Sequence, residues 1–191
     1  MIIMMTGVLI GQKVEYRGAL NMGKRSNFKR NPRDFYKTPK KAVLPLIAHL
    51  ESNLSFAEPC AGDGQLTNYL LELGDNINLY FESDICPQNK RIHKQDALQI
   101  TTPLKTDYII TNPPWDRKIL HPMIEHFRQL SPTWLLFDAD WLFTKQSIPY
   151  KRYCSKVVPV GRVSWLGNGV SGKDNCAWYL FDRHEADTII F

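Results

Sequence analysis

Residues 108–115 read Tyr-Ile-Ile-Thr-Asn-Pro-Pro-Trp, an apolar run that ends in two prolines and an aromatic residue. A short apolar run bounded by prolines predicts a buried parallel strand, and open α/β sheets keep their active sites at the carboxyl ends of such strands. Proline disfavours helical geometry in the residue before it, so Asn112 and Pro113 should both be extended, with carbonyl groups that do not enter a helix. The same residues also fit an Asn-Pro turn that packs beneath Trp115, with Trp115 as part of the hydrophobic core. The rest of the chain has to decide between chemistry and packing.

A strand, a glycine turn and a helix are predicted ahead of this stretch. Residues 54–58 predict the strand and residues 59–64, Pro-Cys-Ala-Gly-Asp-Gly, the turn; apolar residues at helical spacing predict a helix over residues 66–73 that Gly74 ends. Such a turn lets a ligand approach the backbone and directs helix N–H groups at an anionic group. The sequence lacks Gly-x-Gly-x-x-Gly, and no Lys-Ser or Lys-Thr follows the turn, so a carboxylate fits better than a phosphate. The structural alternative is a plain strand-to-helix turn.

Acidic residues follow the next two predicted strands. Residues 77–81 predict the second strand, and Glu82 ends it, where a nucleoside-binding sheet holds ribose hydroxyls. Asp84 is the reserve candidate, and capping of the following turn is the structural alternative. Residues 91–95 predict a short third strand that ends at Asp96 and Ala97, where an acid could accept from an exocyclic amine.

The remaining segments complete an alternating pattern. Thr38 is predicted to be the N-cap of a helix that begins at Pro39 and that Pro45 should bend or restart. Residues 119–130 predict another helix, residues 134–137 a strand, and residues 141–154 a mixed, partly helical segment. Two last strands, over residues 157–165 and 176–181, are joined by a polar, glycine-rich loop over residues 167–175. This order predicts an α/β fold built as a three-layer sandwich.

Positive charge is concentrated at the start of the chain. The net charge is +5, but residues 1–41 hold ten Lys or Arg and two acidic residues, whereas residues 42–191 have a net charge of −3. We therefore expect a basic, partly flexible arm over residues 1–32 and a single domain over residues 33–191. Lys24, Arg25, Lys29 and Arg30 in the arm can neutralise the phosphates of a nucleic acid. A solvated tail that binds no nucleic acid is the alternative. Whether the protein starts at Met1 or at Met22 stays open.

The composition also excludes some classes of protein. Four cysteines without Cys-x-x-Cys spacing argue against a disulfide framework and a metal site, and they favour a reduced cytoplasm. No apolar run approaches the roughly 20 residues of a membrane span, and residues 1–10 lack the features of a secretory leader. A nucleic acid is thus a better expected partner than a membrane.

Four motifs now stand in one order along the chain. They are Asp-Phe-Tyr-Lys-Thr-Pro at 34–39, Glu-Pro-Cys-Ala-Gly-Asp-Gly at 58–64, the acids after the second and third strands, and Asn-Pro-Pro-Trp at 112–115. The set resembles the S-adenosylmethionine-dependent amino-methyltransferases, above all the small, phage-like N6-adenine DNA methyltransferases. The resemblance covers residues 33–115. It implies a Rossmann-like, seven-stranded mixed sheet with an antiparallel final strand, S-adenosylmethionine as cofactor, and methylation of the N6 amine of adenine in DNA.

The resemblance also implies a role for individual residues. Glu58 would face the cofactor's ammonium, Glu82 its ribose, and Asp96 with Ala97 its adenine. Asn112 and Pro113 would accept the hydrogens of the target amine. The other positions that match the motifs would surround the methionine part of the cofactor: Tyr36, Thr38, Pro59, Cys60, Ala61, Gly62 and Gly64.

The target base has its own predicted contacts. Pro114 would fix the backbone and Trp115 would stack on the base, which has to be flipped out of a DNA duplex. Trp165 would cover the other face of the base, with core packing as the alternative. Only 76 residues follow Trp115, so we expect no separate target-recognition domain.

Other substrates and another class of protein stay open. Adenine in RNA or a protein glutamine amide also suits an Asn-Pro-Pro-aromatic clamp. Trp rather than Tyr at position 115 and the basic arm favour nucleic acid, with DNA ahead of RNA. A nucleic-acid-binding protein that keeps the fold without activity is the alternative class, against which the intact Asn112–Trp115 motif speaks.

Overall fold

The computed structural model describes residues 34–101 and 103–190 of the chain. The predicted basic arm, with Lys24, Arg25, Lys29 and Arg30, lies outside these residues. Within them, one mixed sheet of eight strands has the order β3-β2-β1-β4-β5-β7-β6-β8. Its strands are β1 (Ser55–Glu58), β2 (Asn78–Asp84), β3 (His93–Lys94), β4 (Tyr108–Thr111), β5 (Thr133–Asp138), β6 (Cys154–Gly161), β7 (Cys176–Phe181) and β8 (Ile189–Ile190).

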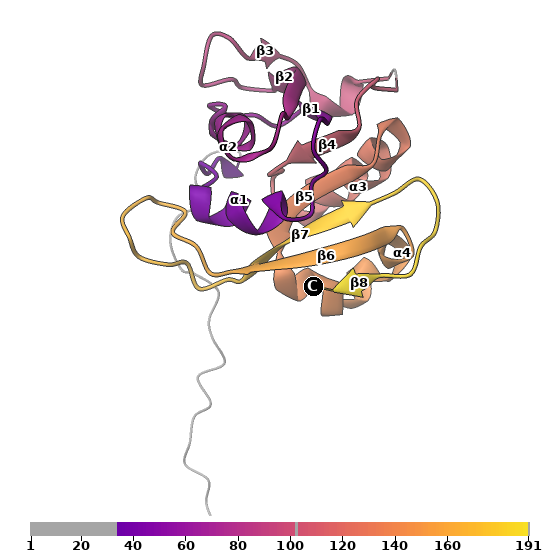
Figure 1. Ribbon diagram of the computed structural model, residues 1–191. Helices are drawn as coiled ribbons and strands as arrows, with labels where there is room; N and C mark the ends of the chain where they lie inside the picture. The colour runs from indigo at the N-terminus through magenta and orange to yellow at the C-terminus, as the bar shows by residue number, and fades with distance from the viewer. Residues whose placement is uncertain (1–33, 102, 191) are drawn as a thin grey trace, which may run out of the picture.

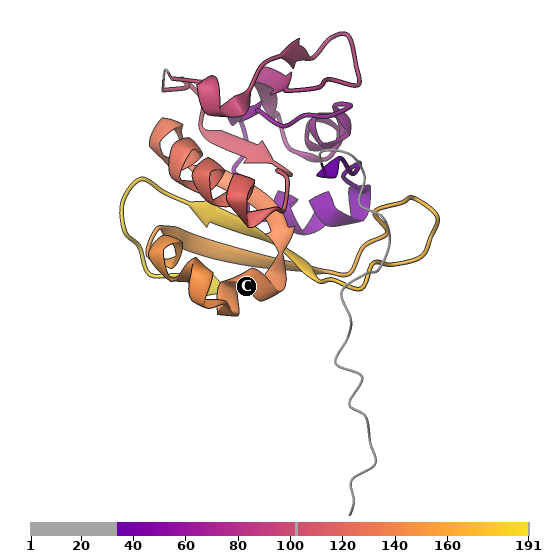
Figure 2. The same ribbon diagram turned by 180° about the vertical axis from the view of Figure 1, so that it is seen from behind.

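Helices cover both faces of this sheet (Figures 1 and 2). The helices α1 (Lys40–Ile47) and α2 (Gln65–Leu73) lie on one face, and α3 (Arg117–Leu130) lies on the other. The connection from β5 to β6 lies on the same face of the sheet as α3 and contains three short helices, η3 (Ala139–Phe143), η4 (Lys145–Ser147) and α4 (Ile148–Lys151). Another short helix, η2 (Ala97–Gln99), comes directly after β3. The predicted three-layer α/β sandwich is confirmed.

Alternation along the central strands explains the three layers. In β5, Trp134 and Leu136 pack against α1 and α2, whereas Leu135 and Phe137 face α3. All four side chains are buried, as expected for strands whose successive residues point to opposite faces of a covered sheet. The same alternation continues in β4 and β7, so two hydrophobic cores lie back to back.

The strand directions bring the predicted site to one edge. β1 pairs in parallel with β2 and with β4, and β4 with β5. Their carboxyl ends, at Glu58, Glu82–Asp84, Thr111 and Asp138, therefore meet at the same edge. Glu58 and Glu82 are direct partners in the register of β1 and β2.

Several sequence predictions about individual segments were wrong. The sheet has eight strands instead of seven, because the two-residue β8 pairs in parallel with β6; the predicted antiparallel strand is β7. The partly helical character predicted for residues 141–154 is confirmed, since short helices continue to Lys151, and only Cys154 already belongs to β6. β6 ends at Gly161 instead of Trp165, and β2 continues past Glu82 to Asp84.

The first helix also differs from its prediction. α1 begins at Lys40, its N-cap residue is Pro39, and no side chain caps it. Thr38 contacts Asn112 instead of the helix. Pro45 lies inside α1 without interrupting it. No helix in the described part of the chain is both long and apolar enough to cross a membrane.

Candidate active site

A cavity of about 330 Å³ opens at the carboxyl edge of β1, β2 and β4. Three segments line most of it: residues 34–38 throughout, and residues 58–66 and 84–88 with gaps. Asn112 and Pro114, from the loop after β4, complete the lining. Among the predicted cofactor residues, the cavity brings together Tyr36, Thr38, Glu58, Cys60, Ala61 and Gly62.

The glycine turn forms one wall of the cavity. Gly62 has a φ of 57°, a left-handed backbone conformation that residues other than glycine rarely adopt. Its N–H donates to Asp84 Oδ2 at 2.9 Å, while Asp84 Oδ1 accepts from the N–H of Cys86 at 2.7 Å. Asp84, the reserve candidate for the ribose, thus lines the cavity and holds the turn in place. Gly64 lies outside the lining, as the N-cap residue of α2.

Glu58 is a buried carboxyl group in the cavity wall. Its side chain is 1% exposed, and its Oε2 accepts hydrogen bonds from the backbone N–H and the hydroxyl group of Thr67 on α2. Burial raises the pKa of Glu58 to about 8, and the neighbouring carboxylates Glu82 and Asp63 also raise it, against the lowering effect of Thr67. Near neutral pH, a bound cation would favour the ionised form of this group.

Glu82 is engaged by an arginine. Its Oε1 forms an ion pair with Arg91 Nε at 2.9 Å, and the guanidinium also donates to Asn68 Oδ1 at 2.8 Å. Glu82 Oε2 is buried and has no hydrogen-bond partner among the described residues. The carboxylate is therefore half satisfied, although Glu82 is not part of the cavity lining.

Three other predicted cofactor residues do not reach the cavity lining. Asp96 caps η2, because its Oδ1 accepts from the N–H of Leu98 at 3.0 Å. Ala97 is buried in the hydrophobic core beside α3. Pro59 lies in the turn after β1 but does not line the cavity. Their roles in cofactor binding stay predictions.

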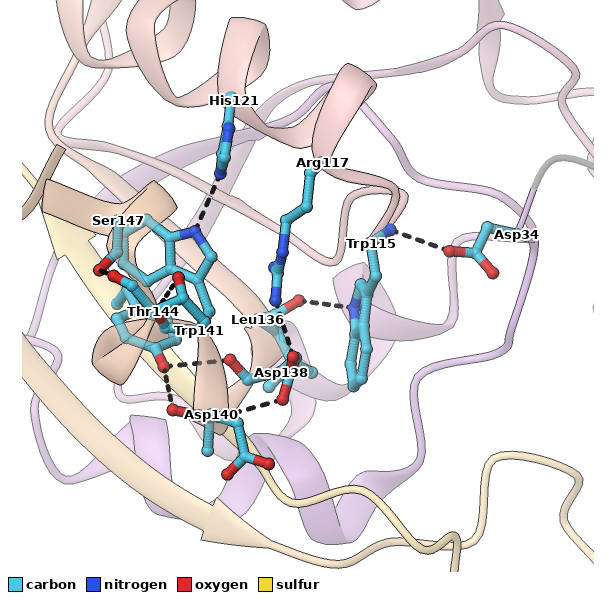
Figure 3. Close-up of polar contacts among 12 residues, drawn as sticks. Asp34, Trp115, Arg117, His121, Leu136, Asp138, Asp140, Trp141, Thr144 and Ser147 are labelled. Atoms are coloured by element: carbon cyan, nitrogen blue, oxygen red, sulfur yellow. Dashed lines mark hydrogen bonds and ion pairs between the residues drawn. The ribbon is translucent and has the colours of Figure 1, made fainter. Parts of the chain in front are cut away.

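Asn112 joins the cavity to the loop after β4. Its Nδ2 donates to Thr38 Oγ1 at 3.1 Å, and its Oδ1 accepts from the indole Nε1 of Trp115 at 3.2 Å. The same indole N–H is shared with the backbone oxygen of Leu136 in β5, at 3.1 Å. The backbone N–H of Trp115 donates to Asp34 Oδ2 at 2.9 Å (Figure 3). Both ends of the Asn112 carboxamide thus have partners. Pro113 is buried beside it.

Trp165 contacts Trp115 itself. The two ring centroids are 5.3 Å apart and the ring planes are nearly perpendicular, at 87°. A base held between two aromatic faces needs parallel rings on either side, so this edge-on arrangement would have to change before Trp165 could cover a base. The predicted role of Trp165 is not tested by this geometry.

Sequence reasoning missed a polar cluster beside Trp115. Arg117 Nη2 pairs with Asp138 Oδ2 at 2.7 Å, and Trp141 Nε1 donates to His121 Nε2 at 3.0 Å (Figure 3). Burial, and secondarily Arg117, lowers the pKa of His121 and so favours the neutral ring, and the indole N–H that donates to Nε2 selects the form with its proton on Nδ1. The signal was present, since Asp138 ends a parallel strand just as Glu58 does.

Solved structures with a similar fold include several proteins named as methyltransferases. A "putative RNA methyltransferase" from Pyrococcus horikoshii has a TM-score of 0.59 at 13% identity, over 86% of this chain and 93% of that one. The methyltransferase subunit of a type I restriction-modification system from Streptococcus thermophilus has a TM-score of 0.51 at 13% identity, over 82% of this chain and 47% of the subunit. A 23S rRNA methyltransferase, ErmE, has a TM-score of 0.51 at 14% identity, over 80% of this chain and 71% of that one.

These likenesses establish the fold. The chain spans less than half the length of the restriction-modification subunit. No protein-family model and no curated protein matches the chain by sequence.

Proposed function

We propose that this chain transfers a methyl group from S-adenosylmethionine to the N6 amine of adenine in a nucleic acid, with DNA as the first substrate to test. One observation carries the proposal. Asn112, of the Asn-Pro-Pro-Trp motif, follows the carboxyl end of β4 and lines the same cavity as the glycine turn and Glu58. An acceptor for an amine and a candidate cofactor site therefore adjoin each other.

The cavity lining and Glu82, the register partner of Glu58, support S-adenosylmethionine as the cofactor. S-adenosylmethionine supplies an electrophilic methyl group on a sulfonium, together with an ammonium, a carboxylate and a ribose. Glu58 would pair with the ammonium, and the buried, unpartnered Oε2 of Glu82 supports a role as acceptor for a ribose hydroxyl. Gly62 lines this cavity in a left-handed conformation and packs closely against Phe35, so the turn has no room for a side chain at this position.

The chemistry of the target amine explains why Asn112 and Pro113 are needed. An exocyclic amine on an aromatic ring is a poor nucleophile, because its lone pair is delocalised into the ring. Two acceptors, Asn112 Oδ1 and the Pro113 carbonyl, would each take one amine hydrogen and so favour a pyramidal nitrogen. Neither is a strong base, so the proton leaves after the methyl group has arrived, when the nitrogen has become acidic. Positioning and charge stabilisation would supply most of the rate.

The proposed substrate class rests on Trp115 and on the positive charge of the basic residues 1–41. A base stacked on this ring would gain about 1–3 kcal/mol, and a base in a duplex would first be flipped out. Adenine in RNA is the second candidate, because RNA methyltransferases are among the structures with the same fold. The chemistry at the amine is the same for both.

One assay tests the proposal. The purified chain is incubated with labelled S-adenosylmethionine and, separately, with unmethylated duplex DNA, single-stranded DNA and RNA, and digests are analysed for N6-methyladenine. We expect the product from at least one polymer, and a loss of about 100-fold or more in Asn112→Ala. Asn78→Ala is the matched control, because Asn78 is exposed at the opposite edge of the sheet, at the start of β2. An absence of N6-methyladenine with all three polymers would contradict the proposal.

A further inference from the structure

We infer that the indole N–H of Trp115 sets the orientation of the Asn112 carboxamide, so that Trp115 is a positioning residue as well as a stacking surface. The inference rests on the proposed function and goes beyond it. Stacking needs only an aromatic ring, which phenylalanine would also supply, whereas the orientation of Asn112 needs the indole N–H, which phenylalanine lacks. Hydrogen bonds join three side chains, those of Thr38, Asn112 and Trp115, and the backbone oxygen of Leu136.

The indole group has only one possible direction of hydrogen bonding. Its N–H can donate and cannot accept, and the backbone oxygen of Leu136 can only accept. The bond between them, at 3.1 Å, therefore fixes the indole on β5. The carboxamide atom that faces the same N–H, at 3.2 Å, has to be the oxygen, because an NH₂ group there would oppose a donor with a donor.

Thr38 completes the arrangement without deciding it. A hydroxyl group can donate or accept, so Thr38 would tolerate either orientation of the carboxamide. With the oxygen held by Trp115, the NH₂ group faces Thr38, whose Oγ1 accepts at 3.1 Å. The hydroxyl hydrogen of Thr38 is then available to donate to another acceptor. Because Thr38 also lines the cavity, an anionic group of the cofactor is a suitable acceptor.

The orientation matters for the reaction. Asn112 Oδ1 has two lone pairs, of which Trp115 uses one, so the other can accept a hydrogen of the target amine. In the reversed orientation the NH₂ group would point at the amine and would donate where an acceptor is required. With the Asn112 carboxamide reversed, the enzyme could still bind cofactor and base, but Asn112 could not accept a hydrogen from the target amine. A defect in orientation should therefore lower kcat and leave the binding of cofactor and base largely intact.

The activity test compares Trp115→Phe in two backgrounds. Phenylalanine keeps an aromatic face and removes the N–H, so we expect kcat to fall about tenfold, with KM for nucleic acid and Kd for cofactor changed by less than about threefold. In Asn112→Asp the carboxylate has two equivalent oxygens, so an oxygen faces the target amine whichever way the group is turned. In the Asn112→Asp background, Trp115→Phe should therefore change kcat by about twofold or less. Equal effects in the two backgrounds, or a fall caused only by a higher KM, would overturn the inference.

A spectroscopic test reads the geometry without turnover. Trp115 is one of five tryptophans, and its indole ¹H–¹⁵N signal is assigned by its loss in Trp115→Phe. Asn112→Ala should shift this signal, whereas Asn78→Ala should not. The indole signal of Trp178, whose N–H donates to the backbone oxygen of Ala42, serves as the internal reference for intact folding. An unchanged Trp115 signal in Asn112→Ala would overturn the inference.

The two tests separate two kinds of failure. If the wild type methylates none of the three polymers while Asn112→Ala shifts the indole signal, the proposed function fails and the orientation of Asn112 by Trp115 stands. If the wild type is active but Trp115→Phe acts equally in both backgrounds, the proposed function stands and the inference fails. Thr38→Ser should keep the activity that Thr38→Val lowers, since only serine retains the acceptor.

Discussion

Folding stability should fall with rising pH because of Glu58. Burial raises the pKa of this carboxyl group from 4.5 to about 8 in the folded chain, whereas the unfolded chain keeps the ordinary value. Between these values the folded state binds one proton more than the unfolded state. The stabilising contribution is thus fully present below about pH 4.5 and is lost as pH rises through about 8. One proton corresponds to about 1.4 kcal/mol per pH unit in this window.

Glu58→Gln removes this proton while keeping the shape of the side chain. Urea unfolding of wild type and variant at about pH 5.5, 6.5 and 7.5 gives the difference in unfolding free energy at each pH. We expect the difference to move in favour of the variant by about 1.4 kcal/mol per unit, close to 3 kcal/mol over the range. Titrating groups that do not interact with Glu58 cancel in this difference.

The control is Glu51→Gln, which changes an exposed carboxyl group just before β1. Its difference from wild type should stay flat across the range. A flat difference for Glu58→Gln as well would mean that Glu58 ionises as easily in the folded chain as in the unfolded chain, and the argument from burial would be refuted.

Three further outcomes follow from Glu58, Gly62 and Glu82. Binding of S-adenosylmethionine at about pH 6.5 should release close to one proton, because Glu58 ionises to pair with the ammonium; calorimetry in buffers of different ionisation enthalpy measures the release, which Glu58→Gln should abolish. Gly62→Ala should destabilise the fold by more than Gly167→Ala and should weaken cofactor binding. Both glycines have positive φ, which costs alanine about 1–2 kcal/mol, but only at Gly62 would the added Cβ lie 2.5 Å from the ring of Phe35, which lines the cavity; thermal unfolding of both variants checks this. Glu82→Gln should raise the Kd for cofactor by about tenfold, the loss expected for a hydrogen bond to a charged group, and an unchanged Kd would remove Glu82 from the ribose role.

The layered fold was predictable because its signals are local and repeated. Apolar runs close to a proline mark β1, β4 and β5, and helical spacing marks α2 and α3. The failures lie in short segments, where packing overrides the local pattern. Trp141 and Ser147 are buried in the short helices after β5, and β8 is a two-residue strand that pairs with the edge of β6.

The candidate site was predictable in its membership and less so in its contacts. A residue at the carboxyl end of a parallel strand can be placed near the site from sequence alone, as with Glu58, Glu82 and Asn112. The partner of each side chain depends on distant parts of the chain. Thr38 reads as a helix cap, yet its hydroxyl accepts from Asn112, 74 residues away. Nothing local in the sequence reports such a contact.

The position of Asn112 links the two halves of the proposed reaction. Its NH₂ group faces Thr38 and the cavity in which the methyl donor would lie, and its oxygen faces Trp115, on which the target base would stack. A methyl group passing from cofactor to base therefore has to pass close to this one carboxamide. Because the oxygen lies on the side where the base would stack, it could hold the amine without competing for the cofactor. The direction of a single amide group, set by an indole that can only donate, is then what makes the pocket and the aromatic surface parts of one site.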